Sequence, residues 1–455
     1  MDRAEILKSD KEVIYKKLKY TPSPEQQKIH DDATRNRLVS GGERGGKSKL
    51  GAMELTGSIF ADAGNLYWLF GATYQETSQE YFYLTDNFNK LGLLASVTKV
   101  FNPGEIVLKT GTVIKTISGT DPRAIGREAP DGILVCEAAK IDYITFLRLT
   151  ARCAEKRAWM LLTGTFEGSL GWYPEKFIEW QLPNVEGRSF SLPSWSNLVV
   201  FPGGRKDPEI IRQEKSLPKE LFDERFGGVP CPPTGLVFKE FKVTHHVKDI
   251  SINFNEPIYL AIDPGFAGAY AVEVVQVIND VIYVVDEVYE QHKVHSEVIQ
   301  ICQMRPWWDK VTAGGWGTID IAGTQHHAQP AAVEVWTKQA GIALNSQKVP
   351  IDEGINRLRT FLKINPLTNQ PSMVISPKCR GLISEFGGCP NPFTTGSGAG
   401  KQMVYQYKMD RENNVMGEDP EDKNNHGIKA MIYFLVGRFG YANRSQNQKT
   451  KVKYW

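Results

Sequence analysis

The clearest chemical signal in the sequence is a glycine-rich loop that ends in a lysine and a serine. Residues 41–48 fit the pattern G-x-x-x-x-G-K-S in full. Glycines let backbone N–H groups turn inward around phosphate oxygens, and the positive end of a following helix adds to the attraction. In this pattern the lysine reaches the β- and γ-phosphates and the serine hydroxyl holds Mg²⁺. A chance match is the alternative, and the strand and helix patterns on either side argue against it. The expected nucleotide-binding residues are Gly41, Gly42, Glu43, Arg44, Gly45, Gly46, Lys47 and Ser48.

A second candidate for nucleotide chemistry follows the apolar run at 133–135. The chain continues as Cys136-Glu137, so a thiol stands where loops of this kind usually have an aspartate partner. We expect Glu137 to orient the attacking water as a general base, with an ordinary strand-end carboxylate as the alternative. Because a neutral thiol accepts hydrogen bonds poorly, Cys136 predicts slow basal hydrolysis that an aspartate at this position would accelerate.

Two further aspartates each end a short apolar run. Asp263 follows the run at 258–262, and Asp320 ends a later run, each shortly before a glycine. If the two strands are neighbours, their carboxylates can share metal ions that activate water and stabilise a leaving oxygen. Hard oxygen ligands favour Mg²⁺ or Mn²⁺. A lone aspartate at a strand end is more often a turn or cap residue, so the pair is what predicts a metal site.

The elements that must position these residues follow one pattern in the first half of the chain. Short apolar runs alternate there with helical segments, which predicts βαβ units on a parallel sheet. A helix-like run begins at Lys47, directly after the glycine-rich loop. The expected strands are 37–40, 66–70, 132–135 and 159–163.

The second half has a different order of elements. Three consecutive strands are expected at 258–262, 269–277 and 281–289. The short turn 278–280 predicts that the last two form a hairpin. A helix near 295–305, a strand through Asp320 and a closing amphipathic helix near 424–438 follow. The fold class is therefore α/β, with an N-terminal RecA-like P-loop domain on a parallel sheet and a C-terminal RNase H-like domain on a mixed sheet.

The composition excludes several classes of protein. Across 455 residues, 41% hydrophobic and 11% aromatic side chains suffice for buried cores in roughly two to three domains. No run of about 18 apolar residues occurs, and the charged start lacks the apolar stretch of a secretory signal. Six scattered cysteines without a C-x-x-C pair predict neither a disulfide framework nor a zinc site, which fits a reducing cytoplasm. The net charge of +2 is compatible with nucleic acid without arguing for it.

Several short strings occur in a characteristic order around these sites. Pro-Glu-Gln-Gln at 24–27 precedes the glycine-rich loop, and Thr-Gly-Thr at 163–165 follows a strand. Three further strings are GSLGWY at 168–173, PSWSN at 193–197 and GLVFKEF at 235–241. In order and spacing, this set resembles the large terminase subunits of tailed phages over nearly the whole chain. In that family the first string contains the adenine-reading glutamine and the second is the motif that couples hydrolysis to movement.

The resemblance implies an ATP-driven motor that moves double-stranded DNA into a procapsid, joined to an endonuclease that cuts concatemeric DNA. It implies ATP and Mg²⁺ as cofactors, with Mn²⁺ able to substitute in the nuclease site. The implied partners are double-stranded DNA, the small terminase subunit and the portal protein of the procapsid. On the portal a homo-oligomeric ring is expected, and a monomer in solution is left open. The expected location is the cytoplasm of the bacterial host, without membrane association.

The same resemblance assigns roles to individual residues. Gln26 is the expected adenine contact. Arg44 is expected to bridge to the γ-phosphate, with a solvated loop arginine as the alternative. Arg127 is the first candidate for an arginine finger, and Arg123 is the second. Contact with solvent or DNA alone is an equally good interpretation of both.

The third metal ligand is where the sequence departs from the family pattern. On its closing helix the family usually has Asn-His, two residues, then Asp-Ala, whereas residues 425–430 read Asn-His-Gly-Ile-Lys-Ala. A protonated lysine cannot bind a metal, so Lys429 marks either a contact with the scissile phosphate or a weakened or substituted site. Asp422 and His426 are the candidate replacements. Glu287 is an outside candidate that fits a structural role better.

The expected domain limits are 1–225 for the ATPase, 226–255 for a linker rich in Gly and Pro, 256–440 for the nuclease and 441–455 for a tail. The tail has four basic residues and no acidic one, which is typical of a solvated end, and the resemblance adds contact with the portal or DNA. Two other functions stay open. The first is a helicase or translocase without a packaging role, which does not explain the aspartate pair Asp263 and Asp320. The second is a DNA-binding homologue whose two sites have decayed, which Cys136 and Lys429 would suggest.

Overall fold

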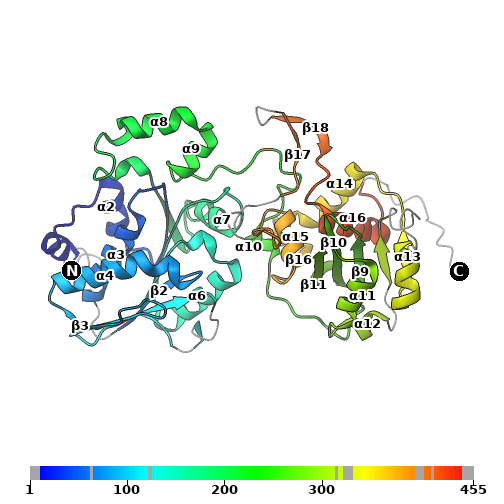
Figure 1. Ribbon diagram of the computed structural model, residues 1–455, viewed down its shortest axis with the longest axis horizontal. Coiled ribbons are helices and arrows are strands. Elements are labelled where there is room, and N and C mark those ends of the chain that lie inside the picture. The colour runs from blue at the N-terminus through cyan, green and yellow to red at the C-terminus, as the bar shows by residue number, and fades with distance from the viewer. Residues whose placement is uncertain are drawn as a thin grey trace. The chain divides into compact units, whose positions relative to one another are not determined.

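The computed structural model describes residues 11–61, 65–120, 125–126, 128–312, 316–320, 331–394, 404–410 and 414–442. The chain divides into two compact units, residues 1–232 and 233–455, each with its own sheet (Figure 1). The boundary between them falls inside the segment 226–255, and the finer division into four parts stays a prediction. None of the helices in the described residues is long and apolar enough to cross a membrane.

The first unit is built on an eight-stranded, mainly parallel sheet. In spatial order its strands are β3 (Leu94–Val97), β4 (Glu105–Leu108), β5 (Val113–Ser118), β2 (Leu66–Gly71), β6 (Gly132–Val135), β7 (Trp159–Gly164), β1 (Asn36–Gly41) and β8 (Gly187–Leu192). The run from β5 to β8 is parallel, and β3 and β4 extend one edge in antiparallel fashion. One strand, β7, separates β1 from β6, which is the strand order of RecA-like ATPases. The predicted parallel sheet is confirmed.

Both faces of this sheet are covered, which explains the continuous apolar runs in its central strands. Every residue of β1 and of β6 is buried. Strands that alternate with helices along a chain bury both faces in this way, and such strands read as unbroken apolar segments. The helices of the unit are α2 (Pro24–Asp31), α3 (Lys47–Ser58), α4 (Ser78–Lys90), α6 (Tyr143–Lys156), α7 (Trp172–Glu179), α8 (Pro208–Ser216) and α9 (Lys219–Arg225).

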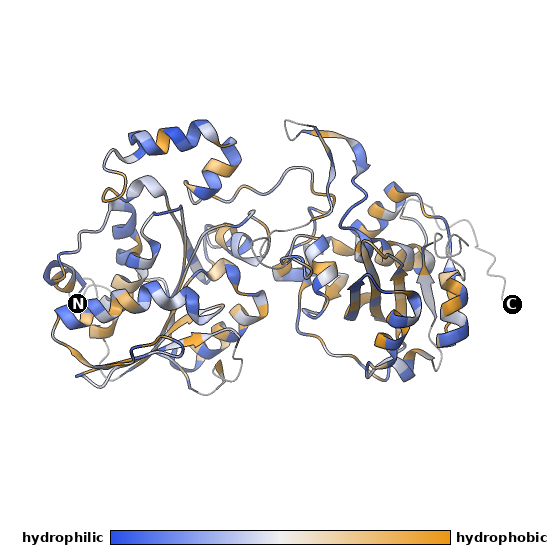
Figure 2. Ribbon diagram, in the orientation of Figure 1, coloured by the Kyte–Doolittle hydropathy of each residue, from blue (hydrophilic) through white to orange (hydrophobic). Residues whose placement is uncertain are grey.

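Helices α8 and α9 have a small hydrophobic cluster of their own. It contains Phe201, Ile210, Phe222 and Phe226 and is separate from the core of the sheet. Figure 2 shows that α8 is mainly hydrophilic, so only a narrow face of it is available for burial.

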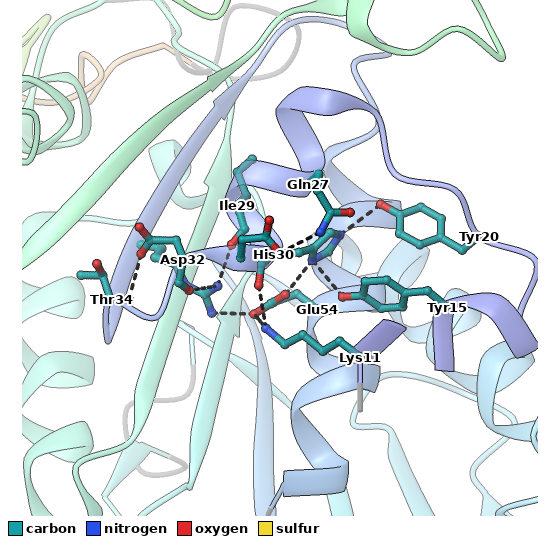
Figure 3. Close-up of polar contacts among 11 residues, drawn as sticks. Lys11, Tyr15, Tyr20, Gln27, Ile29, His30, Asp32, Thr34 and Glu54 are labelled. Carbon is teal, nitrogen blue, oxygen red and sulfur yellow. Dashed lines mark hydrogen bonds and ion pairs between the residues drawn. The ribbon is translucent and has the colours of Figure 1, made fainter. Parts of the chain in front are cut away.

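A buried ionic cluster fastens the first described residues onto α3 (Figure 3). The Glu54 carboxylate is fully buried and contacts three basic groups at 2.7 Å each: Lys11 Nζ, Arg37 Nη2 and His30 Nδ1. Although burial alone would raise the pKa of Glu54, the charges of Arg37 and Lys11 outweigh it and hold that pKa well below its usual range. Removal of one partner from such a cluster leaves an uncompensated buried charge, which costs about 3–5 kcal/mol. Because His30 belongs to α2, this cluster also fixes α2 relative to the helix that follows the glycine-rich loop.

The second unit contains a six-stranded mixed sheet. In spatial order its strands are β13 (Leu344–Ser346), β12 (Gly317–Ile319), β9 (Tyr259–Asp263), β10 (Ala269–Ile278), β11 (Val281–Gln291) and β16 (Met373–Ile375). Strand β10 is antiparallel to both β9 and β11, whereas β12 is parallel to β9. This is the order of an RNase H-like sheet, and that prediction is confirmed. The predicted hairpin also forms, with Asn279 and Asp280 both at positive φ, as a two-residue turn of type I′ requires.

The helices around this second sheet include several that the sequence did not predict. Helices α11 (His295–Gln303) and α16 (His426–Phe439) were expected. The others are α10 (Val243–His246), α12 (Trp308–Thr312), α13 (Ala332–Val335), α14 (Ile351–Leu362) and α15 (Arg380–Glu385). A short two-stranded ribbon is formed by β17 (Tyr407–Met409) and β18 (Val415–Pro420). The closing helix α16 starts two residues later than expected, at His426, and packs against β9, β10 and β12.

Candidate functional site

The glycine-rich loop joins β1 to α3 at the carboxyl edge of the first sheet. Gly46 is the N-cap of α3 and has φ +90°, a conformation that side chains with a Cβ rarely adopt. A Cβ on Gly42 would lie 2.3 Å from the Phe226 carbonyl oxygen, so only glycine allows the loop this close to that backbone. The loop is therefore shaped as a turn that exposes the N-terminus of α3, which is the geometry that binds phosphate.

The loop lysine contacts the string predicted to couple hydrolysis to movement. Lys47 Nζ lies 2.7 Å from Thr165 Oγ1 and 3.1 Å from the Gly41 carbonyl oxygen. Thr165 in turn donates to the same carbonyl at 3.2 Å. Burial lowers the pKa of Lys47. The segment after β7 is thus in direct contact with the residue expected to bind the phosphates.

Two other predicted strings contact the same loop. The Gln26 side chain lies beside it, because a Cβ built on Gly46 would be 3.1 Å from Gln26 Nε2. The Ser194 hydroxyl donates to the Glu43 carbonyl at 2.6 Å, and Asn197 Nδ2 donates to the Arg44 carbonyl at 2.6 Å. The string PSWSN at 193–197 therefore holds the backbone of the loop, a role that the sequence alone did not reveal.

The glycine-rich loop contains two charged residues before Lys47, Glu43 and Arg44. Arg225 of α9 donates to Glu43 Oε1 at 2.6 Å, so α9 is tied to the loop by an exposed ion pair. Arg44 has φ +58°, a strained conformation for a residue that is not glycine. Its contact with a γ-phosphate stays a prediction. Arg127 and Arg123, the arginine-finger candidates, lie outside the described residues.

Strand β6 ends at Val135 and is followed by the buried Cys136 and by Glu137, which has φ +48°. A carboxylate from another element reaches this strand end. Glu80, in the first turn of α4, interacts with the side chains of Ser48 and Cys136 and is only 4% exposed. Burial raises its pKa. The sequence analysis missed Glu80, because no local motif marks it.

In the second unit, Asp263 and Asp320 end neighbouring strands. Strand β9 ends at Asp263, and Asp320 follows β12, whose Ile319 pairs with Ile262. The Asp320 backbone N–H donates to the Ile262 carbonyl at 3.3 Å, which brings the two aspartates to the same edge. Asp263 is 4% exposed. Burial raises its pKa, and His426 opposes that effect.

The first residue of α16 supplies a direct partner for this pair. His426 Nδ1 lies 2.7 Å from Asp263 Oδ2. Although burial alone would lower the pKa of His426, the hydrogen bond to Asp263 outweighs it and raises that pKa. The other side of the ring lies against Gly268, where a Cβ would be 2.3 Å from His426 Nε2. This contact orients the imidazole toward Asp263.

The remaining candidate ligand forms an ion pair instead. Asp422 Oδ1 lies 2.6 Å from Lys429 Nζ, and the Asp422 side chain is 84% exposed. The hydrogen bond to Lys429 lowers the pKa of Asp422. The charge of Lys429 also opposes the rise in the pKa of Asp263 that burial causes. A metal role for Asp422 therefore requires it to leave its lysine partner, and it stays a proposal.

The donors at this edge fit a hard cation in part. Asp263 and Asp320 supply carboxylate oxygens of the kind that Mg²⁺ and Mn²⁺ prefer. Within the described ranges, however, no group of three or more His, Cys, Asp or Glu side chains is arranged to hold a metal ion. Among the described residues, two carboxylates are therefore in place at this edge without a third metal ligand beside them.

Two buried glutamates hold the helices around the site. Glu287 accepts hydrogen bonds from the backbone N–H groups of Gly381 and Leu382, at 2.8 and 2.7 Å, at the start of α15. Glu385, at the end of α15, accepts from the N–H groups of Gly427 and Ile428 at 3.1 and 2.8 Å. Glu287 thus has a structural contact, as the sequence analysis favoured, whereas the role of Glu385 was missed.

In this fold a RecA-like unit precedes an RNase H-like unit along the chain. Chains of similar fold include three solved structures from phages. One is the large terminase of a thermophilic bacteriophage in complex with ADP, at 16% identity and a TM-score of 0.41, covering 91% of this chain and 99% of that chain. Another is the HK97 bacteriophage large terminase, at 10% identity and 0.42, covering 92% and 95%. The third is the ATPase domain of the Thermus phage P74-26 large terminase, at 19% identity and 0.40, covering 48% and 96%.

No protein-family model matches the chain, and no curated protein matches it by sequence. At identities of 10–19% and TM-scores of 0.40–0.42, the similar structures carry no argument about activity. Function is therefore inferred below from this chain's own residues.

Proposed function

We propose that this chain is a large terminase subunit: an ATP-driven translocase of double-stranded DNA joined to a metal-dependent endonuclease. The observation that carries the proposal is that one chain has two separate sheets, each with a different set of candidate catalytic residues at its strand ends. In the first sheet the phosphate-binding loop follows β1, and in the second Asp263 and Asp320 end adjacent strands. The order of the short motifs supports the packaging role in particular.

In the ATPase half, Lys47 and the N–H groups of the loop bind the β- and γ-phosphates, and Glu137 orients the attacking water. Mg²⁺, held through Ser48, neutralises phosphate charge when it is bound. Lys47 Nζ contacts Thr165, so an ammonium that turns toward a phosphate gives up that 2.7 Å bond. We infer that this exchange links the nucleotide to the segment after β7, which is how hydrolysis is passed on as movement.

In the nuclease half, Asp263 and Asp320 are the residues that would hold the metal. The chemistry that a divalent cation would supply there is activation of water and stabilisation of the leaving oxygen of a phosphodiester. His426 donates to Asp263, because an ionised carboxylate only accepts hydrogen bonds. This bond engages Asp263 Oδ2, so Oδ1 is the oxygen left free to bind a metal ion. Lys429, whose charge acts on Asp263, would supply a positive charge for the DNA backbone.

The decisive experiment compares two full-length variants, Lys47→Ala and Asp263→Ala, in two assays. Lys47→Ala is expected to abolish ATP hydrolysis and to leave Mn²⁺-dependent nicking of a supercoiled plasmid unchanged. Asp263→Ala is expected to do the reverse, because the two sites lie in different units. Asp86→Asn, an exposed change on α4, serves as the control for both assays. A parent protein without either activity would contradict the proposal.

Translocation needs its own assay. A third strand bound to duplex DNA should be displaced in the presence of ATP, while a forked duplex stays annealed. Separation of the forked strands would favour a helicase instead. The proposed partners are double-stranded DNA, the small terminase subunit and the portal protein, on which we propose that the chain forms a ring.

A further inference from the structure

Two neighbouring strands of the first sheet bring an unexpected carboxylate to the nucleotide site. Strands β2 and β6 are adjacent and parallel, so both end at the edge where the phosphate-binding loop lies. After β2 the chain passes through a short turn, Tyr74–Thr77, into α4. Glu80 is in the first turn of that helix. The topology therefore places Glu80 beside the end of β6, where Cys136 stands.

The packing of α4 on α3 fixes this placement. Asn87 Nδ2 donates to Thr56 Oγ1 at 3.0 Å, and Lys49 Nζ donates to Asn87 Oδ1 at 3.3 Å. The Lys49 ammonium also lies 4.9 Å from the centre of the Tyr83 ring. These contacts align the two helices along the part of α3 that follows Ser48, so the first turn of α4 faces the phosphate-binding loop.

The surroundings of Glu80 are those of a group that accepts hydrogen bonds at this site. The Ser48 hydroxyl and the Cys136 thiol both interact with it, and its charge acts on Lys47. Its Oε2 atom is buried and has no hydrogen-bond partner in the described structure. A buried carboxylate oxygen without a partner is costly, and such atoms call for an explanation. This one lies next to the serine that is expected to hold Mg²⁺.

We propose that Glu80 is the carboxylate that positions Ser48 and the water around Mg²⁺, in place of the aspartate that Cys136 replaces. The inference rests on the proposed ATPase function and adds a residue to it. In P-loop enzymes a strand-end aspartate accepts hydrogen bonds at this point. Glu80 reaches the same point from α4, one strand away. It is a positioning residue, distinct from Glu137, which orients the attacking water.

This assignment changes what Cys136 is expected to do. The sequence alone predicted that Cys136→Asp would accelerate hydrolysis, because the thiol accepts poorly. Because Glu80 already lies beside that thiol, an added aspartate would set two buried carboxylates against each other. Like charges at such a site repel, so Cys136→Asp alone is expected to gain nothing. The gain should appear only when Glu80 has lost its charge.

The test measures the affinity of the full-length protein for a fluorescent ADP, with Mg²⁺ and with EDTA. In the parent, Mg²⁺ should tighten binding by about tenfold or more, the range expected of hydrogen bonds to a charged group. Glu80→Gln should lose most of that gain, and the double variant Glu80→Gln/Cys136→Asp should recover it. Cys136→Ala should keep the parent's gain. Asp86→Asn, which removes an exposed acid of the same helix, is the matched control. Circular dichroism checks that each variant is folded.

Each outcome separates this inference from the broader proposal. If the parent binds neither Mg²⁺·ADP nor ATP, the proposed ATPase function is wrong. If the parent responds to Mg²⁺ and Glu80→Gln responds equally, only the role of Glu80 is wrong. If Glu80→Gln does not fold, Cys136→Ala still tests the inference. A loss of the Mg²⁺-dependent gain in ADP affinity in Cys136→Ala would assign the positioning role to the thiol instead of Glu80.

Discussion

His426 Nδ1 lies 2.7 Å from Asp263 Oδ2, and this pair joins the start of α16 to the end of the central strand β9. It forms because Glu385 holds the N-terminus of α16 through two backbone N–H groups. The carboxylate at the strand end is thus oriented by a helix 163 positions away in the sequence.

The first prediction separates the hydrogen bond of His426 from the rest of its side chain. His426→Ala should lower plasmid nicking about 10- to 100-fold, the loss typical of removing a partner that orients a metal ligand. His426→Asn should keep most of the activity, because its amide can donate to Asp263 from nearly the same place. Nicking rates are measured with Mn²⁺, and Lys338→Ala, an exposed change, is the control. Equal nicking rates for His426→Ala and the parent would show that His426 has no role in DNA cleavage.

The second prediction concerns Lys429, which is paired with Asp422 at 2.6 Å. Lys429→Asp adds a carboxylate near Asp263 and removes a positive charge. Without metal, the added repulsion should lower the melting temperature. With Mn²⁺, the same variant should be stabilised more than the parent, because a ligand that binds only the folded state raises its stability. Thermal unfolding with and without Mn²⁺ measures both effects.

The matched control for that experiment is Lys429→Met, which removes the charge without adding a ligand. It should not gain a response to Mn²⁺. If Lys429→Asp and Lys429→Met respond alike, the side chain at this position does not face the metal site.

The third prediction concerns Glu385, which accepts from Gly427, Ile428 and the Tyr289 hydroxyl. Glu385→Gln replaces one acceptor oxygen by a donor, so at least one buried N–H group loses its partner. A loss of about 1–3 kcal/mol in stability is expected from denaturant unfolding. Nicking should fall as well, because His426 is the first residue of α16 and would move with the start of that helix. Glu421→Gln, an exposed change, should leave both unchanged. Full nicking by a destabilised Glu385→Gln would show that Glu385 has no part in orienting the site.

The fourth prediction concerns pH and the cluster around Glu54. Burial lowers the pKa of His30 below its ordinary value. The unfolded chain therefore binds a proton at a pH where the folded one does not, and stability falls as the pH drops below about 6.5. Hydrogen exchange of α2 should lose protection between pH 7.5 and 5.5, a range of about one unit on either side of that value, after correction for the intrinsic rate. His30→Gln should show a smaller change, and His292→Gln, an exposed control, the parent's change. An equal pH response in His30→Gln would show that another group titrates.

The fold was predictable because its main signals are local. Strands β1, β6 and β9 are short apolar runs. Glycine follows the first and glutamate closely follows the second, and the third ends in aspartate, so the sequence itself indicates where each strand stops. The turn at Asn279-Asp280 is likewise encoded by neighbouring residues. The second unit was harder, since α14 and α15 lie in long connections where no motif marks a function. Their boundaries depend on contacts such as those of Glu287, which are made across the chain.

The sequence by itself determined the phosphate-binding loop and the two strand-end aspartates. These are contiguous strings, and the backbone conformation that they need is set by their own glycines and their neighbours. Only the tertiary structure decided which distant groups complete each site. Glu80 meets Cys136 because β2 and β6 are adjacent, and His426 meets Asp263 because α16 packs on β9, although the two residues are 163 positions apart. Side chains brought together by strand order and helix packing leave no pattern in a single sequence, because their spacing along the chain is set by the lengths of the connections between them.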